Sequence, residues 1–524
     1  MPGGNPSTQD EAARLSARHY DEVPYHSFPN ALLQPSRLGA VATLCGHDAV
    51  DPGRARVLEI GCATGGHLIP IAARYPAAQF VGIDVSGVQI EQGRSRIAAL
   101  GLDNIRLDTL SIADITEPDA SFDYIICHGV FSWVPTGIRE AILQQCRRLL
   151  TPQGLAVISF NVLPGWRMLQ VFRDSAILHC RQFATPGEKA RNMRALFDAL
   201  SKYTSEQTSY GKIWRKELGL LTANPDFYLL HELLEDSNTP MTFSAFNGEI
   251  TAHGLQYLAD ANLLAGIPEN AGDDRGSLIR ALAGDDRLSI EQYTDIVLGR
   301  TFRSAIVVRA EIPQRPEPAP HLPRLSGMHL VVPMNLEVKE LGDGRCSLVD
   351  GKAGEIDING PHAAAVVRKM IARRPSTCSY AELVEASGEA EARRQAADCL
   401  HRLVAMGVID ASLDGLDCGG WPSTHPRAWP VALADARAGD GYTVSQRHES
   451  VQLNERSRYL LRGCDGTRPV AAFETALLDT ILSGGATIAE NGQPIRDPER
   501  LRVIVRDAVV GELADFARRG LLLP

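Results

Sequence analysis

The chain has 524 residues, too many for a single hydrophobic core, so we expect three or so domains. Its 44% apolar and 22% charged residues are typical of a globular protein, no apolar run reaches the roughly 20 residues of a membrane span, and the first residues lack the features of a secretion signal. The net charge of −10 argues against a nucleic-acid partner, because duplex binding generally needs a basic face.

The first fifty residues are expected to form an arm or lid before the first strand. Residues 1–17 are polar and are predicted to be disordered. Tyr20 and Tyr25 follow, and the apolar spacing predicts a helix from about Pro35 to Cys45. The two tyrosines either cover a ligand and donate hydroxyl contacts to it, or only pin the arm to the surface.

The pattern from Val57 to Asp84 is the most informative part of the sequence. Val57 to Ile60 is short, apolar and β-prone, as expected for a buried parallel strand. The small residues from Gly61 to Gly66 let backbone N–H groups approach a ligand closely. A second apolar strand, Gln79 to Ile83, leads into Asp84, where an acid can accept hydrogen bonds from the hydroxyls of a ribose. The segment therefore predicts a site for an adenosine-containing cofactor.

The loop alone leaves two cofactor classes open. Gly61-x-Ala63-x-x-Gly66 loosely fits the G-x-G-x-x-G of nicotinamide sites, in which the helix N-terminus holds a pyrophosphate. The overlapping Glu59-x-Gly61-x-x-x-Gly65 resembles motif I of the class I S-adenosylmethionine methyltransferases, with Ala63 in place of the middle glycine often seen in that family. An acid before the loop suits a sulfonium ligand without phosphate, because the acid offsets positive charge.

Three further strands and their turns support the methyltransferase resemblance. The strands are Asn104 to Leu107, Phe122 to His128 and, after a turn at Thr151 to Gly154, Leu155 to Phe160. Strands alternating with helical patterns imply an α/β fold with a Rossmann-like, doubly wound parallel sheet, which binds ligands at the carboxyl ends of its strands. In the resembling family, a turn such as Ser111 to Asp114 flanks the adenine ring, and a pair such as Phe122-Asp123 begins the fourth strand. No Asp/Asn-Pro-Pro-Tyr/Phe follows that strand, which counts against methylation of nucleic-acid bases.

Five longer phrases carry a closer resemblance. They begin at Tyr20, His128, Asn161, His231 and Arg300 and read YDEVPY, HGVFSWVP, NVLPGW, HELLE and RTFR. They are similar to phrases of bacterial methyltransferases with a methyltransferase regulatory domain. That family includes protein lysine methyltransferases that modify outer-membrane proteins, and a branch of similar architecture methylates peptide carboxylates. The resemblance covers residues 18–310 and extends only loosely to the C-terminal third.

Helical patterns dominate the chain after Trp166. The predicted helices are Met168 to Phe183, Pro186 to Tyr203, Phe227 to Leu234 and Phe243 to His253. Leu255 to Leu258 and Ala305 to Val308 are expected to return as the last strands of the sheet. The proline-rich stretch Pro313 to Pro323 predicts a stiff linker and is the clearest domain boundary.

Beyond the linker, residues 324–524 are predicted to form a mainly helical, winged-helix-like interaction module. The expected helices are Ala363 to Ala372, Tyr380 to Ala386, Ala390 to Met406, Ala471 to Leu482 and Pro498 to Arg519. Gly407 to Ile409 resembles the start of a wing, but no helix rich in Lys and Arg stands out, so contact with protein is favoured over contact with DNA. The expected domains are an N-terminal arm or lid (1–50), a cofactor-binding Rossmann-like domain (51–165), a helical regulatory region with the last sheet strands (166–312), a winged-helix-like domain (324–420) and a helical domain (421–524).

The site residues are assigned from the strand ends and from the resemblance. The cofactor S-adenosyl-L-methionine is expected to contact Tyr20, Glu59, Gly61, Cys62, Ala63, Gly65, Asp84, Val85, Ser111, Ile112 and His128. The expected catalytic residues are His128, Asn161 and Tyr25, and no metal is expected. Each residue also has a structural interpretation: Asp84 could cap a helix, and His128 could be a satisfied core histidine. His231 and Glu232 could equally be structural contacts or substrate ligands, and they lack the spacing of a zinc motif.

Two functional classes stay open. The first is an active methyltransferase on a protein or peptide, at lysine or alternatively at a carboxylate. The second is a non-catalytic scaffold that binds cofactor or partners. We expect a cytoplasmic protein, because its ten cysteines stand singly, without C-x-x-C spacing, which is typical of reduced thiols. We expect no stable membrane insertion, because no apolar run is long enough to span a membrane. A homodimer through the C-terminal module is a further expectation.

Overall fold

The computed structural model describes residues 18, 20–25, 27–313, 320–350, 354–421, 423–485, 487–490 and 493–524. The predicted disorder of residues 1–17 and most of the predicted linker, residues 314–319, therefore lie outside the described residues. At the end of the linker, His321 donates its backbone N–H to the carbonyl oxygen of Leu44 (2.8 Å), which ties the next segment to the first domain.

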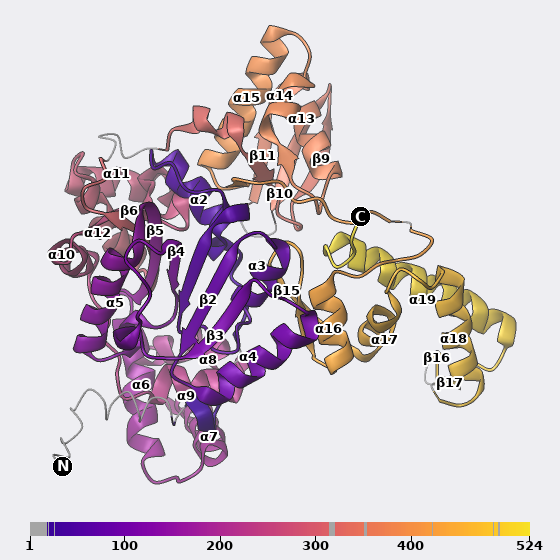
Figure 1. Cartoon of the computed structure of the whole chain (residues 1–524), viewed down its shortest axis with the longest axis horizontal. Helices are drawn as coiled ribbons and strands as arrows, with labels where there is room; N and C mark the ends of the chain where they lie inside the picture. The colour runs from indigo at the N-terminus through magenta and orange to yellow at the C-terminus, as the bar shows by residue number, and fades with distance from the viewer. Residues whose placement is uncertain are drawn as a thin grey trace.

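A seven-stranded sheet forms the centre of the first domain (Figure 1). In chain order its strands are β1 (Arg56–Ile60), β2 (Gln79–Asp84), β3 (Ile105–Thr109), β4 (Phe122–Cys127), β5 (Leu150–Asn161), β6 (Leu255–Asp260) and β7 (Phe302–Arg309). In space the order is β3-β2-β1-β4-β5-β7-β6, and β7 runs antiparallel to both of its neighbours. The strands β1 to β5 are parallel. The predicted doubly wound sheet and its two late strands are confirmed.

Helices cover both faces of this sheet because the buried strands are apolar on both sides. One face packs against α2 (Pro35–Leu44), α3 (Leu68–Arg74) and α4 (Gly87–Leu100). The other face packs against α5 (Thr136–Leu149) and α10 (Phe243–Ala252). Successive side chains of a strand point to opposite faces, so Val57 of β1 joins the first core and Leu58 joins the second.

The start of β5 differs from the prediction. We expected a turn at Thr151 to Gly154, but these residues are extended and continue the strand from Leu150. Phe122 of β4 pairs with Leu150 and Tyr124 already pairs with Leu155, so the extra residues are accommodated as an irregularity in the register. Pro152 and Gly154 therefore mark this irregularity rather than a separate turn.

A helical subdomain follows β5 and carries its own core. It consists of α6 (Arg167–Cys180), α7 (Pro186–Tyr203), α8 (Ser209–Ala223) and α9 (Asp226–Leu234), grouped below the sheet in Figure 1. Trp214 is fully buried among Phe172 and Phe197. Two further helices, α11 (Asp273–Ala283) and α12 (Arg287–Leu298), belong to the segment of the chain that connects β6 to β7. The subdomain begins where β5 ends, so it stands beside the carboxyl edge of the sheet.

The C-terminal part contains two further cores. The first is built from α13 (Pro361–Ala372), α14 (Tyr380–Glu385) and α15 (Ala390–Ala405), all predicted, and from two small sheets that were not. The sheets contain β8 (His329–Val331), β12 (Cys378–Ser379) and β13 (Asp410–Ser412), and β9 (Glu337–Gly342), β10 (Arg345–Asp350) and β11 (Gly354–Ile358). The second core is mainly helical and contains α16 (Pro430–Ala438), α17 (Glu455–Gly463), α18 (Val470–Leu482) and α19 (Pro498–Arg518).

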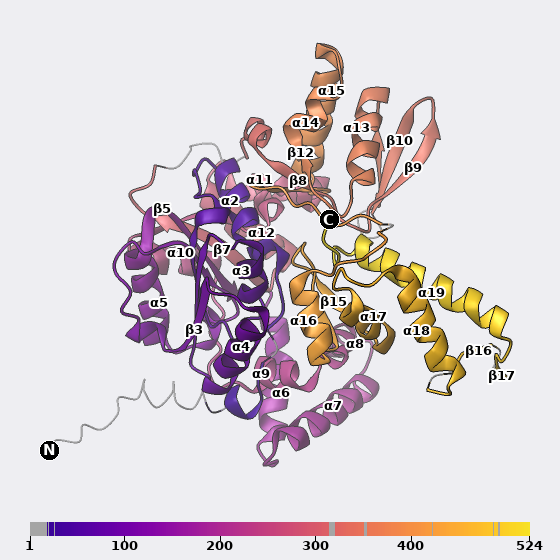
Figure 2. The same cartoon turned by 45° about the vertical axis from the view of Figure 1, so that its right-hand side comes forward.

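The C-terminal part is fixed to the first domain by polar contacts on the α2–α4 face. Arg74 of α3 forms an ion pair with Asp414 (2.9 Å), and Arg96 of α4 forms one with the buried Asp435 of α16 (2.9 Å). Both views show α16 beside α3 and α4 (Figures 1 and 2). Among the described helices, none is long and apolar enough to cross a membrane.

Candidate functional site

The loop after β1 holds its shape through backbone hydrogen bonds. Gly61 (φ +72°), Ala63 (φ +49°) and Gly65 (φ +72°) adopt the left-handed region, which costs a glycine little. The N–H groups of Gly61 and Cys62 both donate to the carbonyl oxygen of Ile83 at the end of β2 (2.8 and 3.1 Å). A Cβ atom at Gly61 would come within 2.4 Å of the side chain of Val130, which enters from the turn after β4. The loop therefore lies between the ends of β2 and β4, as the sequence pattern predicts.

Asp84 ties this loop to the end of β2. Its Oδ2 accepts the N–H of Ala63 (2.9 Å) and its Oδ1 accepts the N–H of Ser86 (2.9 Å). Asp84 is not the cap of α4. That role belongs to Ser86, whose hydroxyl accepts the backbone N–H of Gln89. Each carboxylate oxygen has a second lone pair, so Asp84 keeps the capacity to accept further hydrogen bonds. Burial raises the pKa of Asp84, and the backbone donors oppose that rise.

Glu59 is buried near the end of β1 beside this loop. Within the described residues its Oε2 has no hydrogen-bond partner. Burial raises the pKa of Glu59 well above its ordinary value, and the nearby charge of Asp84 adds to the rise. A cation placed here would reverse both effects, because it would favour the carboxylate form.

His128 and Asn161 follow on the next two strands. His128 stands directly after β4, and its ring lies edge-on to that of Phe302 with centroids 5.7 Å apart. Burial lowers the pKa of His128 to about 4, so its ring is neutral at pH 7. Asn161 ends β5, and its backbone N–H donates to the hydroxyl of Ser132 (2.8 Å). Within the described part of the chain, Nδ1 of His128 and Nδ2 of Asn161 have no hydrogen-bond partner.

These groups share one face of the sheet. Val57, Ile126 and Val157 belong to the core on the α2–α3 side. Glu59, His128 and Asn161 each stand an even number of residues further along the same three strands, so their side chains point to that side as well. Three side chains that each have a buried polar atom without a partner among the described residues thus line the carboxyl edge on one face. Buried polar atoms are normally paired, so such a row marks a place where a polar ligand supplies the partners.

The N-terminal arm crosses the loop and rests on α9. A Cβ atom at Gly66 would come within 1.9 Å of the backbone oxygen of Ser27, so the arm touches the loop directly. Asp21 accepts hydrogen bonds from the hydroxyl of Ser86 (2.6 Å) and the N–H of Val88 (3.3 Å) at the start of α4. The arm is therefore attached on both sides of the cofactor loop.

The two predicted tyrosines of the arm contact the regulatory region. Tyr20 stacks on His231 of α9 with ring centroids 4.3 Å apart. Burial raises the pKa of Tyr20, and the charges of Glu235 and Asp84 add to the rise, so its hydroxyl remains protonated. Tyr25 meets His231 edge-on at 5.8 Å and Phe227 at 5.3 Å. His231 is held by Glu235 (2.8 Å) and by the carbonyl of Val23 (2.7 Å), which supports its structural interpretation.

The remaining predicted residues occupy the rim of the same edge. The side chain of Cys62 is buried in the α2–α3 core, so only its backbone faces the loop. Val85 is half-buried beside Asp84. Ser111 caps the short helix Ile112–Asp114, and Ile112 is buried in the α5–α10 core. Leu110, which precedes them, donates its N–H to the carbonyl of Asp84 (2.9 Å), so this turn adjoins the end of β2.

Two histidines were missed by sequence reasoning. His67 directly precedes α3, and its Nδ1 lies 3.2 Å from the backbone nitrogen of Asn30 and 2.8 Å from Nε2 of His448. His448 belongs to the C-terminal part and has a left-handed backbone (φ +62°). Burial lowers the pKa of His67 to about 3, with His128 contributing, and lowers the pKa of His448 well below its ordinary value. The residues are separated by 381 positions, and no local pattern in the sequence links them.

The residues present fit a nucleoside with a positively charged sulfonium group. Asp84 stands at the end of β2, where the hydroxyls of a ribose are bound in such folds. Glu59 is a buried carboxylate with an unpaired oxygen, which suits a cationic ligand. The loop also fits loosely a dinucleotide site, and comparison with known proteins distinguishes the two.

Family models match three parts of the chain. A methyltransferase domain matches residues 57–154, a predicted methyltransferase regulatory domain matches residues 225–309, and a PKMT C-terminal winged helix domain matches residues 425–521. An uncharacterised protein of Rickettsia prowazekii, RP789, is 30% identical over 96% of this chain and 93% of its own length. A second one, RP028, is 37% identical over 43% of this chain and 91% of its own length.

A solved structure extends the likeness to the whole fold. PKMT2 from Rickettsia typhi, determined in complex with AdoHcy, has a TM-score of 0.83 and 25% sequence identity, and the match covers 96% of this chain and 100% of that one. The chain belongs to the PKMT family of class I methyltransferases. Its cofactor is S-adenosyl-L-methionine, its activity is methyl transfer from that cofactor, and the PKMT-type domain supports a protein substrate.

The PKMT match also bears on the C-terminal part. Its winged-helix model covers the segment for which we predicted a helical domain, residues 421–524. The winged-helix resemblance predicted for residues 324–420, like the other domain boundaries, remains a prediction. The core of that segment combines three helices with two three-stranded sheets.

Proposed function

We propose that this PKMT-family enzyme transfers methyl groups to lysine side chains of a protein substrate. The observation that carries the proposal is the row of Glu59, His128 and Asn161 on one face of the carboxyl edge, three side chains that each have a buried polar atom without a partner among the described residues. The cofactor supplies an activated methyl group on a positively charged sulfur. The chain has to bind and orient the reactants, exclude water and accommodate one proton.

The cofactor side of the site is assigned to backbone and carboxylate groups. Gly61, Ala63 and Gly65 shape the loop, and Asp84 accepts from the ribose. Glu59 offsets the positive charge. Tyr20 is assigned to cover the ribose end of the cofactor. The charge of Asp84 contributes to the raised pKa of the Tyr20 hydroxyl, so the two groups lie near each other, and the ring of Tyr20 stacks on His231 of α9. Cys62, Val85, Ser111 and Ile112 complete the rim through their backbone or apolar atoms.

The acceptor side is assigned to His128, Asn161 and Tyr25. A lysine amine must be uncharged before it reacts, and a buried, dry position favours its neutral form. The amine nitrogen then forms a bond to the methyl carbon as the carbon–sulfur bond breaks, and a proton leaves the nitrogen. The neutral ring of His128 has one nitrogen that can accept a hydrogen bond from the amine, and Asn161 supplies a second polar contact. Orientation of this kind contributes about 7–11 kcal/mol in well-arranged model reactions.

Two experiments test the proposal. Calorimetry with S-adenosylmethionine should give a binding signal for the wild type that Asp84→Ala abolishes, and silence of both proteins would favour the scaffold alternative. Incubation with methyl-labelled cofactor and a cell extract, followed by mapping of the label, should place it on lysine. Base-labile label on Asp, Glu or a C-terminus would support the carboxylate alternative instead.

The proposal extends to location and assembly. A cytoplasmic location is supported by the ten cysteines, which stand singly in the sequence without C-x-x-C spacing. The net charge of −10 agrees with a protein partner rather than a nucleic acid. A homodimer through the C-terminal part is proposed on the resemblance to interaction modules, and the mass in solution tests it.

A further inference from the structure

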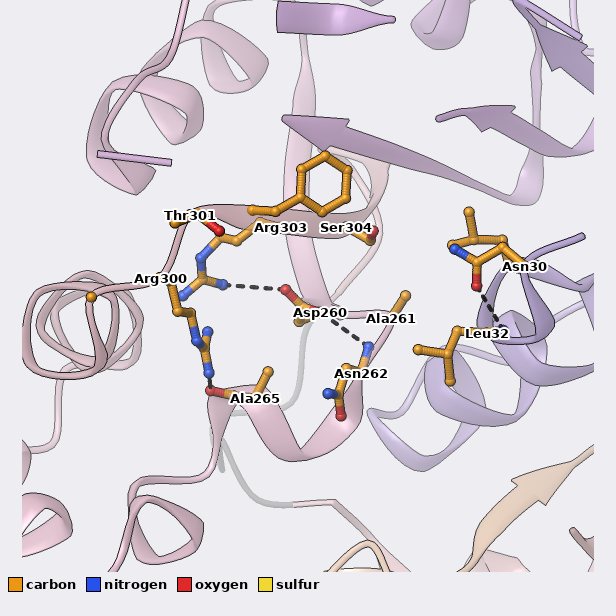
Figure 3. Close-up of a pocket in the computed structure, with 13 residues that line it drawn as sticks. Asn30, Leu32, Asp260, Ala261, Asn262, Ala265, Arg300, Thr301, Arg303 and Ser304 are labelled. Atoms are coloured by element: carbon orange, nitrogen blue, oxygen red, sulfur yellow. Dashed lines mark hydrogen bonds and ion pairs between the residues drawn. The ribbon is translucent and has the colours of Figure 1, made fainter. Parts of the chain in front are cut away.

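A cavity of about 450 Å³ opens at the carboxyl edge next to the row of unpaired groups (Figure 3). Three separate segments line it: the arm and short helix at residues 30–33, the end of β6 with the following turn at residues 260–265, and the start of β7 at residues 299–304. Its volume lies in the range of ligand sites, about 300–1,000 Å³. Neither the sequence pattern nor the cofactor assignment uses this cavity.

Strand pairing connects the cavity with the methyl-transfer site. Phe302 and Ser304 line the cavity, and they pair in register with Asn161 and Ser159 of β5. Directly paired residues point to the same face of a sheet, so the cavity continues the row that ends at Asn161. The ring of Phe302 also meets His128 edge-on at 5.7 Å. Because neighbouring strands lie about 4.7–4.9 Å apart, β7 is roughly 10 Å from the end of β4.

The opposite wall adjoins the cofactor loop. Asn30 lines the cavity, and its backbone N–H lies 3.2 Å from Nδ1 of His67, the first residue after the loop. The side chain of Asn30 accepts the N–H of Leu32 (3.1 Å), which holds the short helix in place at the edge of the cavity (Figure 3). The cavity thus reaches the site from the side away from Asp84, where an acceptor can approach without crossing the cofactor.

The charges around the cavity are already compensated. Arg303 is fully buried, and its guanidinium is bound by Asp295 (2.8 Å) and Glu291 (2.9 Å), with Asp260 at 3.6 Å. Arg300 lies 3.5 Å from Asp295 and donates to the carbonyl oxygen of Ala265. Figure 3 shows the guanidinium group of Arg303 turned toward Asp260 and that of Arg300 turned toward Ala265. Nη1 of each arginine has no hydrogen-bond partner among the described residues, but the three carboxylates of Asp260, Glu291 and Asp295 surround the two guanidinium groups. These surroundings carry no excess of positive charge that would attract an acidic acceptor.

The uncharged residues of the lining suit a polypeptide. Asn262, Thr301 and Ser304 can pair with peptide groups, while Leu32 and Phe302 offer apolar surface. The lysine side chain carries an amine on a flexible four-carbon stem, which needs an apolar path with a polar end. A stem of that length covers much of the distance between β7 and His128.

We propose that this cavity is the acceptor channel, which seats an extended lysine-containing segment of the substrate and leads the lysine side chain past Phe302 to His128. The inference rests on the proposed lysine methylation and adds the place where the acceptor binds and the charge that it carries.

Filling the cavity tests the channel. The probes are two synthetic nonapeptide libraries, one with a central lysine and one with a central glutamate, incubated with labelled S-adenosylmethionine. In Ala265→Trp and Ser304→Phe, the added side chain occupies the cavity. We expect kcat/KM for the lysine library to fall at least about 10-fold in both, while the affinity for AdoHcy changes less than about 2-fold. Ala281→Trp, on the exposed side of α11, is the control and should behave as the wild type.

The outcomes separate this inference from the proposed function. Unchanged kcat/KM in both filled variants would overturn the channel while leaving lysine methylation intact. Failure of the wild type to methylate the lysine library, when lysines of a cell extract are labelled, would likewise overturn an extended segment as the occupant. Label on the glutamate library, or no lysine label in the extract, would instead refute the proposed function. Loss of AdoHcy affinity in one filled variant identifies it as disturbed, and the other then decides.

Discussion

The two halves of the carboxyl edge are built in different ways. At the ends of β1 and β2, backbone hydrogen bonds fix the loop, and both oxygens of Asp84 already accept N–H groups. At the ends of β4 and β5, the polar atoms of His128 and Asn161 are buried without partners in the described part of the chain. The backbone of the cofactor half is therefore pre-formed, although Oε2 of Glu59 has no partner among the described residues, whereas the acceptor half keeps its side-chain hydrogen-bonding capacity for a ligand. Removing a side chain from the cofactor half should mainly lower the affinity for the cofactor, whereas removing one from the acceptor half should mainly lower the turnover.

The largest effect is expected for Asp84→Ala in the cofactor half. The substitution removes the acceptor for the ribose and the tie to Ala63, and hydrogen bonds to a charged group contribute about 1.5–3 kcal/mol each. The affinity for S-adenosylmethionine, measured by calorimetry, should fall at least about 100-fold. Asp103→Ala, an exposed acid in the turn before β3, is the control and should bind as the wild type. Equal affinities would show that the loop does not depend on Asp84.

In the acceptor half, His128→Ala should reduce turnover while leaving cofactor binding nearly intact. An unsatisfied buried partner costs about 1–3 kcal/mol, which corresponds to about 5-fold to 150-fold in turnover. Single-turnover labelling of the lysine library, with AdoHcy affinity as the second readout, measures both quantities. The exposed His425→Ala is the matched control. A variant that loses cofactor affinity and keeps turnover would place His128 in the cofactor half.

Three histidines in and around the site should make the stability of the protein sensitive to acid. Burial lowers the pKa of His67 to about 3 and of His128 to about 4, and also lowers that of His448. Each folded-state pKa lies below the unfolded value of about 6.5, so stability is present at neutral pH and is lost as the pH falls below that value. At pH 5 each such histidine costs about 2 kcal/mol.

Thermal midpoints between pH 7 and pH 5 test this expectation. The wild type should lose stability steeply, and His448→Gln should flatten the profile because one titrating group is gone. Exposed His425→Gln should leave the slope unchanged. A profile that is identical in wild type and His448→Gln would mean that the ring of His448 is not kept neutral by the fold.

The smallest effect is expected for Glu59→Gln, and it should have opposite signs for stability and binding. The pKa of Glu59 is raised, so the folded state holds a proton that the unfolded state releases above about pH 4.5, and stability falls as the pH rises through this window. Glutamine removes that loss. The midpoint of the ligand-free protein should therefore rise by about 2–4 °C per kcal/mol recovered, more at pH 8 than at pH 5. Cofactor affinity should fall, because the offset of positive charge is lost.

The cofactor half was predictable from the sequence because its signals are local. The strand from Val57, the left-handed glycines and Asp84 lie within thirty residues, and each follows from side-chain size, periodicity or charge. The late strands β6 and β7 were also predicted, since both are apolar and buried. The strand β9 was not, because most of its residues are exposed, half of them are charged, and none of them is buried.

The acceptor half could be predicted only in part. His128 and Asn161 stand at strand ends and were found on that ground. The stacking of Tyr20 on His231, the pair His67–His448 and the cavity depend on segments hundreds of residues apart. Tertiary packing creates these contacts and the cavity, so they cannot be predicted from the residue spacing within a single helix or strand.

The contact between His448 and His67 has a consequence for how the chain can be shortened. Nδ1 of His67, the first residue after the cofactor loop, lies 2.8 Å from Nε2 of His448 in the last quarter of the polypeptide. A protein cut after β7 would retain the complete sheet and every predicted site residue, yet the start of α3 would face water instead of an imidazole. The start of α3 is thus held in part by the C-terminal part of the chain, and we expect that an active fragment has to include the segment around His448 rather than stop at the sheet.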